Sequence, residues 1–67
     1  ELLARLTPRE REVLIEVSTG RSNSEIADRL FLSEATVKTH LYHVFTKLDV
    51  DSRTAAVARA REEGLIP

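Results

Sequence analysis

Apolar residues recur along this chain with the three- and four-residue spacing of α-helices, and no segment alternates as a half-buried strand would. One side of a first helix carries Val13, Leu14 and Val17, and the inner side of a short second helix carries Ile26, Ala27 and Leu30. Over residues 34–48 the apolar positions fall into one arc about 100° wide on a helical wheel: Val37, Leu41, Val44, Phe45 and Leu48. With only two glycines and two prolines in the chain, the pattern predicts an all-α fold, a four-helix bundle on short connections.

Local capping signals give the expected helix ends. Thr7, Pro8 and Glu10 form a capping box with proline at the first helical position, and Gly20 suits the residue that ends this helix. Three further starts follow in the same way: a second capping box from Ser22 to Glu25, a cap at Ser33 for a helix ending near Leu48, and a cap at Asp51 or Ser52 for a helix ending near Glu63, before Gly64.

The second and third helices have the spacing of a helix-turn-helix unit. A small residue lets the two helices approach closely and larger apolar residues fill the angle between them: Ile26, Ala27, Leu30, Leu32 and Val37. The turn carries Phe31 where glycine is usual, so the unit is a variant. The same spacing is also compatible with an ordinary two-helix corner in a small bundle.

The outward side of the third helix favours nucleic-acid binding. Between Ala35 and Leu48 there is no carboxylate, whereas an ordinary solvated face mixes both signs of charge. Small and hydrogen-bonding side chains face outward, with cations at the edges: Ala35, Thr39, Tyr42, His43 and Thr46, flanked by Lys38 on one edge and by His40 and Lys47 on the other. The net charge of −1 opposes this interpretation, but a local basic face can bind phosphate on a nearly neutral body.

Length and composition limit the remaining possibilities. Sixty-seven residues make one domain, 1–67, and without cysteine neither a disulfide nor a thiolate metal site can stabilise it. No apolar run approaches the roughly 20 residues of a membrane span and no signal peptide opens the chain, so we expect a cytoplasmic protein with no membrane partner. Because the chain begins at Glu1 without methionine, we expect it to be part of a longer protein.

The order and spacing of several motifs match one family. These are LTPREREVL at 6–14, the stretches 20–30 and 33–41, the pairs Lys47-Leu48 and Arg53-Thr54, and the last segment, from Ala60 to Ile66. Along nearly its whole length the chain resembles the C-terminal DNA-binding domain of LuxR/NarL/FixJ-type bacterial transcription regulators. The resemblance implies a domain whose third helix reads the major groove of duplex DNA. It also implies an upstream receiver domain, as in a two-component response regulator, or a ligand-sensing domain.

The resemblance also implies individual roles. Base contacts are expected from Ala35, Lys38, Thr39 and Tyr42. DNA backbone contacts are expected from Ser22, Asn23, Ser24, Thr36, His40 and Lys47, with the N-terminus of the second helix offering backbone N–H groups to a phosphate. The fourth helix is expected to form a homodimer across a two-fold axis, through Ala56, Val57 and Ala60, on two DNA half-sites.

Three positions depart from the family pattern. Asp49 stands where glycine is usual and must take a left-handed turn, Ile15 is expected to be exposed, and Tyr42 replaces what is often a lysine.

An enzyme is the first alternative class. His40 and His43, near Asp49 or Asp51, invite a metal site. However, the histidines diverge by about 60° on a helix, and a catalytic zinc needs three protein ligands and a pocket. Without a Gly-rich phosphate loop or a nucleophile motif, the sequence predicts no enzyme, cofactor or metal.

Two binding modules remain as alternatives. The alanine-rich fourth helix also suits a pure protein-interaction module, although alanine favours helix formation anywhere. A sigma-factor-like promoter-binding domain would share the helix-turn-helix.

Overall fold

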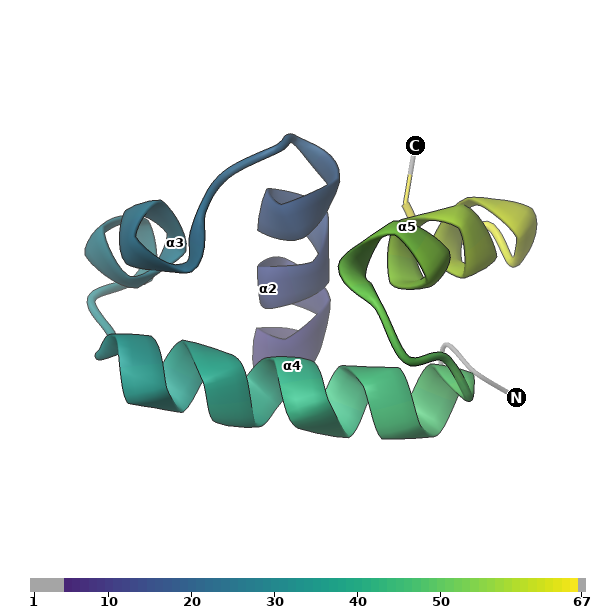
Figure 1. Ribbon diagram of the computed structural model, residues 1–67, viewed down its shortest axis with the longest axis horizontal. Coiled ribbons are helices and arrows are strands. Elements are labelled where there is room, and N and C mark those ends of the chain that lie inside the picture. The colour runs from purple at the N-terminus through teal and green to yellow at the C-terminus, as the bar shows by residue number, and fades with distance from the viewer. Residues whose placement is uncertain (1–4, 67) are drawn as a thin grey trace.

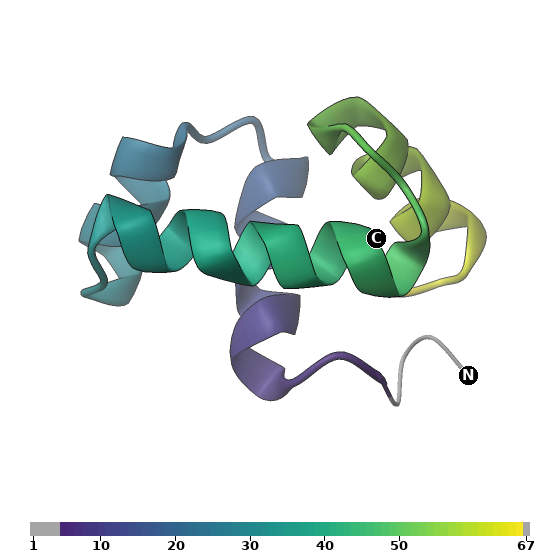
Figure 2. The ribbon, with the colours of Figure 1, turned by 60° about the horizontal axis from the view of Figure 1, so that its bottom comes forward.

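The computed structural model describes residues 5–66, which form four helices and no strand. They are α2 (Pro8–Ser18), α3 (Asn23–Leu30), α4 (Glu34–Leu48) and α5 (Arg53–Glu62). The longest helix, α4, runs along the molecule, with α3 at one end and α5 at the other (Figure 1). Figure 2 shows α2 crossing behind the middle of α4. This arrangement confirms the expected all-α, four-helix fold.

The expected caps begin the helices. At α2, Thr7 Oγ1 accepts a hydrogen bond from the Glu10 backbone N–H (3.1 Å), and Glu10 Oε1 accepts one from the Thr7 N–H (3.0 Å). Ser22 and Glu25 form the same reciprocal box at α3. Single caps begin the other two helices, and Ser52 rather than Asp51 caps α5. These local bonds satisfy N–H groups that a helix leaves unpaired in its first turn.

Two non-glycine residues end helices in the left-handed conformation. Phe31 (φ 58°) follows α3, and Asp49 (φ 58°) follows α4, which confirms the turn expected at Asp49. A side chain in this region typically costs 1–3 kcal/mol, and surrounding contacts must hold it there. The backbone N–H groups of the following residues, Leu32 and Val50, close both helix ends with 2.9 Å bonds to Ala27 and Phe45 carbonyls.

The core consists of two adjoining clusters. One lies around α2, α4 and α5 and includes Leu14, Leu48, Ala56 and Ala60, together with apolar residues from both ends of the described chain, such as Leu6. The other lies inside the α3–α4 corner and contains Val13, Val17, Ile26, Ala27, Val37 and Leu41. The apolar arc predicted for α4 is confirmed, since four of the five residues in the arc are buried and the fifth, Phe45, is half-buried. Within residues 5–66 no helix has the length and apolarity to cross a bilayer.

Candidate nucleic-acid interface

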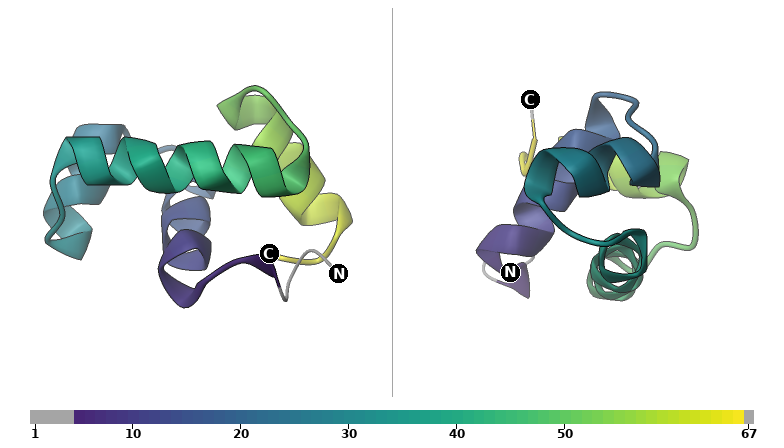
Figure 3. Two further views of the ribbon diagram at one scale, coloured as in Figure 1. Left: turned by 90° about the horizontal axis from the view of Figure 1, so that it is seen from below. Right: turned by 90° about the vertical axis from the view of Figure 1, so that its left-hand side faces the viewer.

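The outer face of α4 carries every residue expected to contact DNA bases. Ala35, Lys38, Thr39 and Tyr42 are all exposed, and 68% of the tyrosine is accessible. Seen from below, α4 lies in front of the other helices, and none of them covers this face (Figure 3, left). The four side chains therefore project from a rigid helix without contributing to the core.

The hydroxyl of Thr39 has a defined orientation. Its Oγ1 donates a hydrogen bond to the Ala35 carbonyl (3.1 Å), one turn earlier in α4. With its hydrogen engaged, this hydroxyl offers lone pairs outward as an acceptor, and its methyl group as an apolar contact. Both features can be complementary to a base edge in the major groove.

The start of α3 carries three of the expected DNA backbone contacts, Ser22, Asn23 and Ser24, but part of it is already hydrogen-bonded. Ser22 is engaged in the capping box with Glu25. Hydrogen bonds from the backbone and side chain of Ser22 lower the pKa of the Glu25 carboxyl. Ser24 is exposed, whereas Asn23, Thr36 and His40 are half-buried. A phosphate approaching here would therefore meet Asn23 and Ser24 rather than the Ser22 hydroxyl.

Lys47 has an intramolecular partner that sequence reasoning missed. Its Nζ lies 2.7 Å from Oε1 of Glu10, a carboxylate on α2 that is only 3% exposed. Burial alone would raise the pKa of Glu10, but hydrogen bonds from Lys47 and from the Thr7 backbone outweigh burial and lower it. The nearby His43 Nδ1, 3.7 Å from Oε2, acts in the same direction. Lys47 therefore joins α4 to α2, and much of its charge is neutralised within the domain.

Arg53, at the first position of α5, is a second residue whose intramolecular contacts the sequence did not reveal. Its guanidinium donates to Asn23 Oδ1 and to the Arg21 carbonyl, both at 2.6 Å. These bonds tie the start of α5 to the start of α3, across 30 and 32 residues of chain. The only sequence signal was the Arg53-Thr54 pair in the family resemblance, which says nothing about this geometry.

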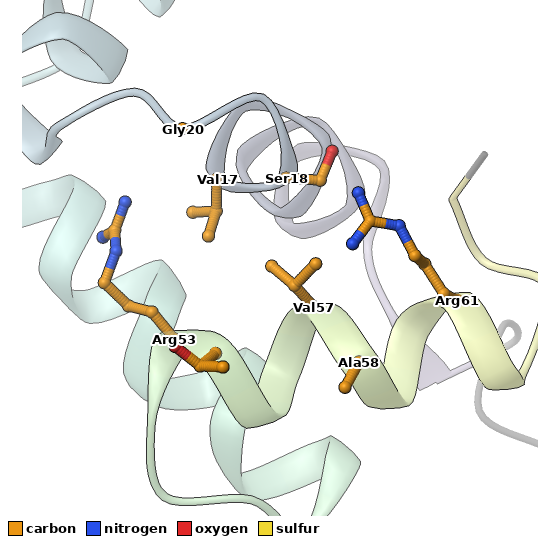
Figure 4. A pocket seen from close by; sticks show the side chains of 8 residues that line it. Val17, Ser18, Gly20, Arg53, Val57, Ala58 and Arg61 are labelled. Carbon is orange, nitrogen blue, oxygen red and sulfur yellow. The ribbon is translucent and has the colours of Figure 1, made fainter.

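The structure corrects the expected dimer surface on the fourth helix, which consisted of Ala56, Val57 and Ala60. Ala56 and Ala60 have no exposed surface, because both pack in the core of their own domain, and Val57 is half-buried against both core clusters. A neighbouring side of α5 is more accessible, because Thr54, Ala58 and Arg61 are exposed there and Val57 is half-buried. It borders a hollow of about 410 Å³ between α5 and the end of α2 (Figure 4). The hollow is lined by Val17, Ser18, Gly20, Arg53, Thr54, Val57, Ala58 and Arg61.

The structure also bears on the sequence interpretation of Ile15. Ile15 is 37% exposed, as expected, while its neighbour Glu16 pairs with Arg29 (2.6 Å) and Arg21 (3.5 Å). Among residues 5–66 no three His, Cys, Asp or Glu side chains come together in a way that could hold a metal ion.

The arrangement of α3, a short turn and α4, backed by α2 and α5, defines a helix-turn-helix DNA-binding domain. Residues 4–60 match the family model described as "Bacterial regulatory proteins, luxR family". The chain belongs to this family, whose members are DNA-binding transcription regulators and not enzymes.

Relatives and solved structures agree with this assignment. The chain is 54% identical over 59 residues to the CsgBAC operon transcriptional regulatory protein of Escherichia coli (strain K12), covering 88% of the chain and 27% of that protein. It is 43% identical over 61 residues to the transcriptional regulatory protein LiaR of Bacillus subtilis (strain 168), covering 91% and 29%.

Two solved structures have the same fold. The response regulator ChrA, from a heme-sensing two-component system, superposes with a TM-score of 0.89 and 54% identity over 91% of this chain and 30% of that one. The transcription factor GerE superposes with a TM-score of 0.87 and 32% identity over 92% of each chain. The chain thus spans less than a third of LiaR and of ChrA and nearly all of GerE.

Proposed function

We propose that this domain binds double-stranded DNA sequence-specifically, with α4 in the major groove. The observation that supports this most strongly is the uncovered face of α4, where Ala35, Lys38, Thr39 and Tyr42 are exposed and independent of the core. Lys38 has the charge and reach to donate to guanine O6 and N7. Thr39 offers an acceptor or a methyl group, and Tyr42, one turn on, reaches either a base or the backbone.

The phosphate contacts surround this face. Asn23 and Ser24 at the start of α3 would meet one strand, and Thr36 and His40 lie on α4 itself. Lys47 contributes less than a free lysine would, because its ammonium is paired with Glu10. Contacts of this kind fix the register of α4 on the duplex and make binding depend on salt.

We further propose that the domain binds as a homodimer through the outer face of α5. Thr54, Val57, Ala58 and Arg61 follow the i, i+3, i+4, i+7 spacing of a single helix face, and all four border the hollow shown in Figure 4. Small side chains there permit two helices to approach closely across a two-fold axis. Such a dimer would bind two half-sites about one helical turn apart.

The domain would be the C-terminal part, residues 1–67, of a longer cytoplasmic regulator. This proposal is supported by the small share of the longer relatives that the chain covers, 27% to 30%. The description of ChrA as a response regulator favours a preceding receiver domain, as in a two-component system. A ligand-sensing domain is the alternative.

The direct test is titration of a duplex selected from a random pool, at several salt concentrations. With about three to five phosphate contacts per copy, log Kd should change with log salt with a slope of magnitude about 3–5 per monomer. Binding without a preferred sequence would contradict base reading by α4. If no duplex binds, the protein-interaction function becomes the better explanation of the exposed α5 face.

A further inference from the structure

A second hollow lies beside the base-reading side of α4, between this helix and the starts of α3 and α5. It measures about 290 Å³ and is distinct from the hollow in Figure 4, although Arg53 borders both. It is lined by Asn23, Lys38, Leu41, Tyr42, Phe45 and Arg53. Lys38 and Tyr42 are expected base-contact residues, so the hollow adjoins the proposed DNA interface.

The lining combines two kinds of chemistry. Leu41, Tyr42 and Phe45 supply apolar surface from one side of α4, while Lys38, Arg53 and Asn23 supply two cations and an amide. No lining residue is a carboxylate. A nucleotide of the DNA backbone has the complementary pattern, because its deoxyribose is uncharged and largely apolar and its phosphate carries one negative charge.

Arg53 is held ready for such a ligand. The 2.6 Å bonds to Asn23 and to the Arg21 carbonyl use two of the five N–H donors of the guanidinium and fix its position. Both partners are uncharged groups. Within residues 5–66 no carboxylate forms an ion pair with Arg53, whereas Lys47 pairs with Glu10, and Arg21 and Arg29 pair with Glu16. The charge of Arg53 is therefore available to an anion at low cost in side-chain entropy.

We propose that this hollow holds one backbone nucleotide of the DNA strand that borders the groove entered by α4, with its deoxyribose against Tyr42 and Phe45 and its phosphate bound by Arg53. This inference rests on the proposed function and adds to it a phosphate-binding residue on α5. The simpler interpretation is that Arg53 only fastens α5 to α3. The two differ in whether removing the arginine charge eliminates the contribution of one particular phosphate.

The experiment uses duplexes in which one phosphate at a time is replaced by an uncharged methylphosphonate. With the parent domain, one position next to the half-site should weaken binding about tenfold, as expected for a charge-assisted hydrogen bond worth ~1.4 kcal/mol. With Arg53→Gln, which keeps a polar side chain with an N–H donor but carries no charge, that position should become insensitive. Arg53→Lys should keep the sensitivity in part. Arg29→Gln, at the other end of α3, serves as the matched control and should leave the profile of the parent unchanged.

The possible outcomes separate this inference from the function on which it rests. If the parent domain binds no duplex, the proposed function fails. If it binds and Arg53→Gln retains every methylphosphonate effect, DNA binding stands and the nucleotide site is refuted. If circular dichroism shows that Arg53→Gln does not fold, the test uses the NMR resonances of the Arg53 side-chain N–H groups in the parent domain. They should shift on adding the intact duplex and stay in place with the methylphosphonate duplex, and equal shifts with both would refute the site.

Discussion

The ammonium of Lys47 lies 2.7 Å from the carboxylate of Glu10, and only 3% of Glu10 is exposed to solvent. A lysine at the edge of α4, the helix proposed to bind DNA, is therefore also part of the contact between α4 and α2. A substitution at Lys47 is therefore expected to change the stability of the domain as well as its charge.

The first prediction concerns this pair. Lys47→Ala leaves the buried Glu10 carboxylate without its strongest hydrogen bond, so the free energy of unfolding should fall by roughly 1–3 kcal/mol. The salt dependence of DNA binding should change by less than the one unit expected from a free lysine. Thermal and urea melts together with salt titrations measure both quantities. An unchanged melting curve with a salt slope lower by one would instead make Lys47 a free phosphate contact.

The second prediction follows from the lowered pKa of Glu10. Because the folded-state pKa lies below that of the unfolded chain, the carboxylate stabilises the domain above the unfolded value, about 4.3. This contribution is lost as the pH falls through the folded-state pKa. Lys47 and His43 are the basic side chains that face the carboxylate. Melting temperatures of the parent and Glu10→Gln, measured from pH 6 to pH 3, should therefore converge toward low pH, and curves that stay parallel would contradict the assignment.

The third prediction tests the packing of α4. Leu41 is 5% exposed and lies in the cluster that joins α3 to α4, so Leu41→Ala should cost about 2–5 kcal/mol. In a domain of this size such a loss leaves little folded protein. Tyr42→Ala, at the next and exposed position, is the control and should melt close to the parent. Similar melting of both variants would mean that α4 is rotated relative to the core.

The fourth prediction concerns the proposed dimer. Ala58 is exposed on α5, while Val57 packs against the core, so Ala58→Glu is the cleaner probe. It should abolish cooperative binding to a duplex with two half-sites and leave binding to a single half-site intact. Parallel titrations of the two duplexes provide the measurement. Cooperative binding that survives the substitution would exclude this face of α5 as the contact between copies.

Much of the fold was predictable because its signals are local. Each cap lies within three residues of the N–H group it binds, as at Thr7 and Glu10, and the apolar arc of α4 has a regular spacing. The proposed base-contact residues Lys38, Thr39 and Tyr42 could be predicted to face outward for the same reason, since all three lie outside that arc, with Lys38 at its edge.

The errors and omissions arise where local signals end. Lys47–Glu10 and Arg53–Asn23 join residues 37 and 30 positions apart, and nothing in the spacing of either pair reveals the contact. On α5, alanines occur on several sides of the helix and give little indication of which side is buried. Ala56 and Ala60 were therefore wrongly assigned to the surface, although Ala58, two residues from each, is exposed.

The central claim is that the outer face of α4 reads DNA bases, and Lys38→Ala tests it most directly. Lys38 is exposed and outside both core clusters, so the melting temperature should be almost unchanged. The decisive measurement is selection of binding sites from a random pool by the parent domain and by the variant. We expect the variant to lose about 1–3 kcal/mol of binding, mainly as lost discrimination at one or two base pairs. An unchanged preferred site with uniformly weaker binding would reduce Lys38 to a phosphate contact, and an unfolded variant would contradict the assignment of this face to DNA.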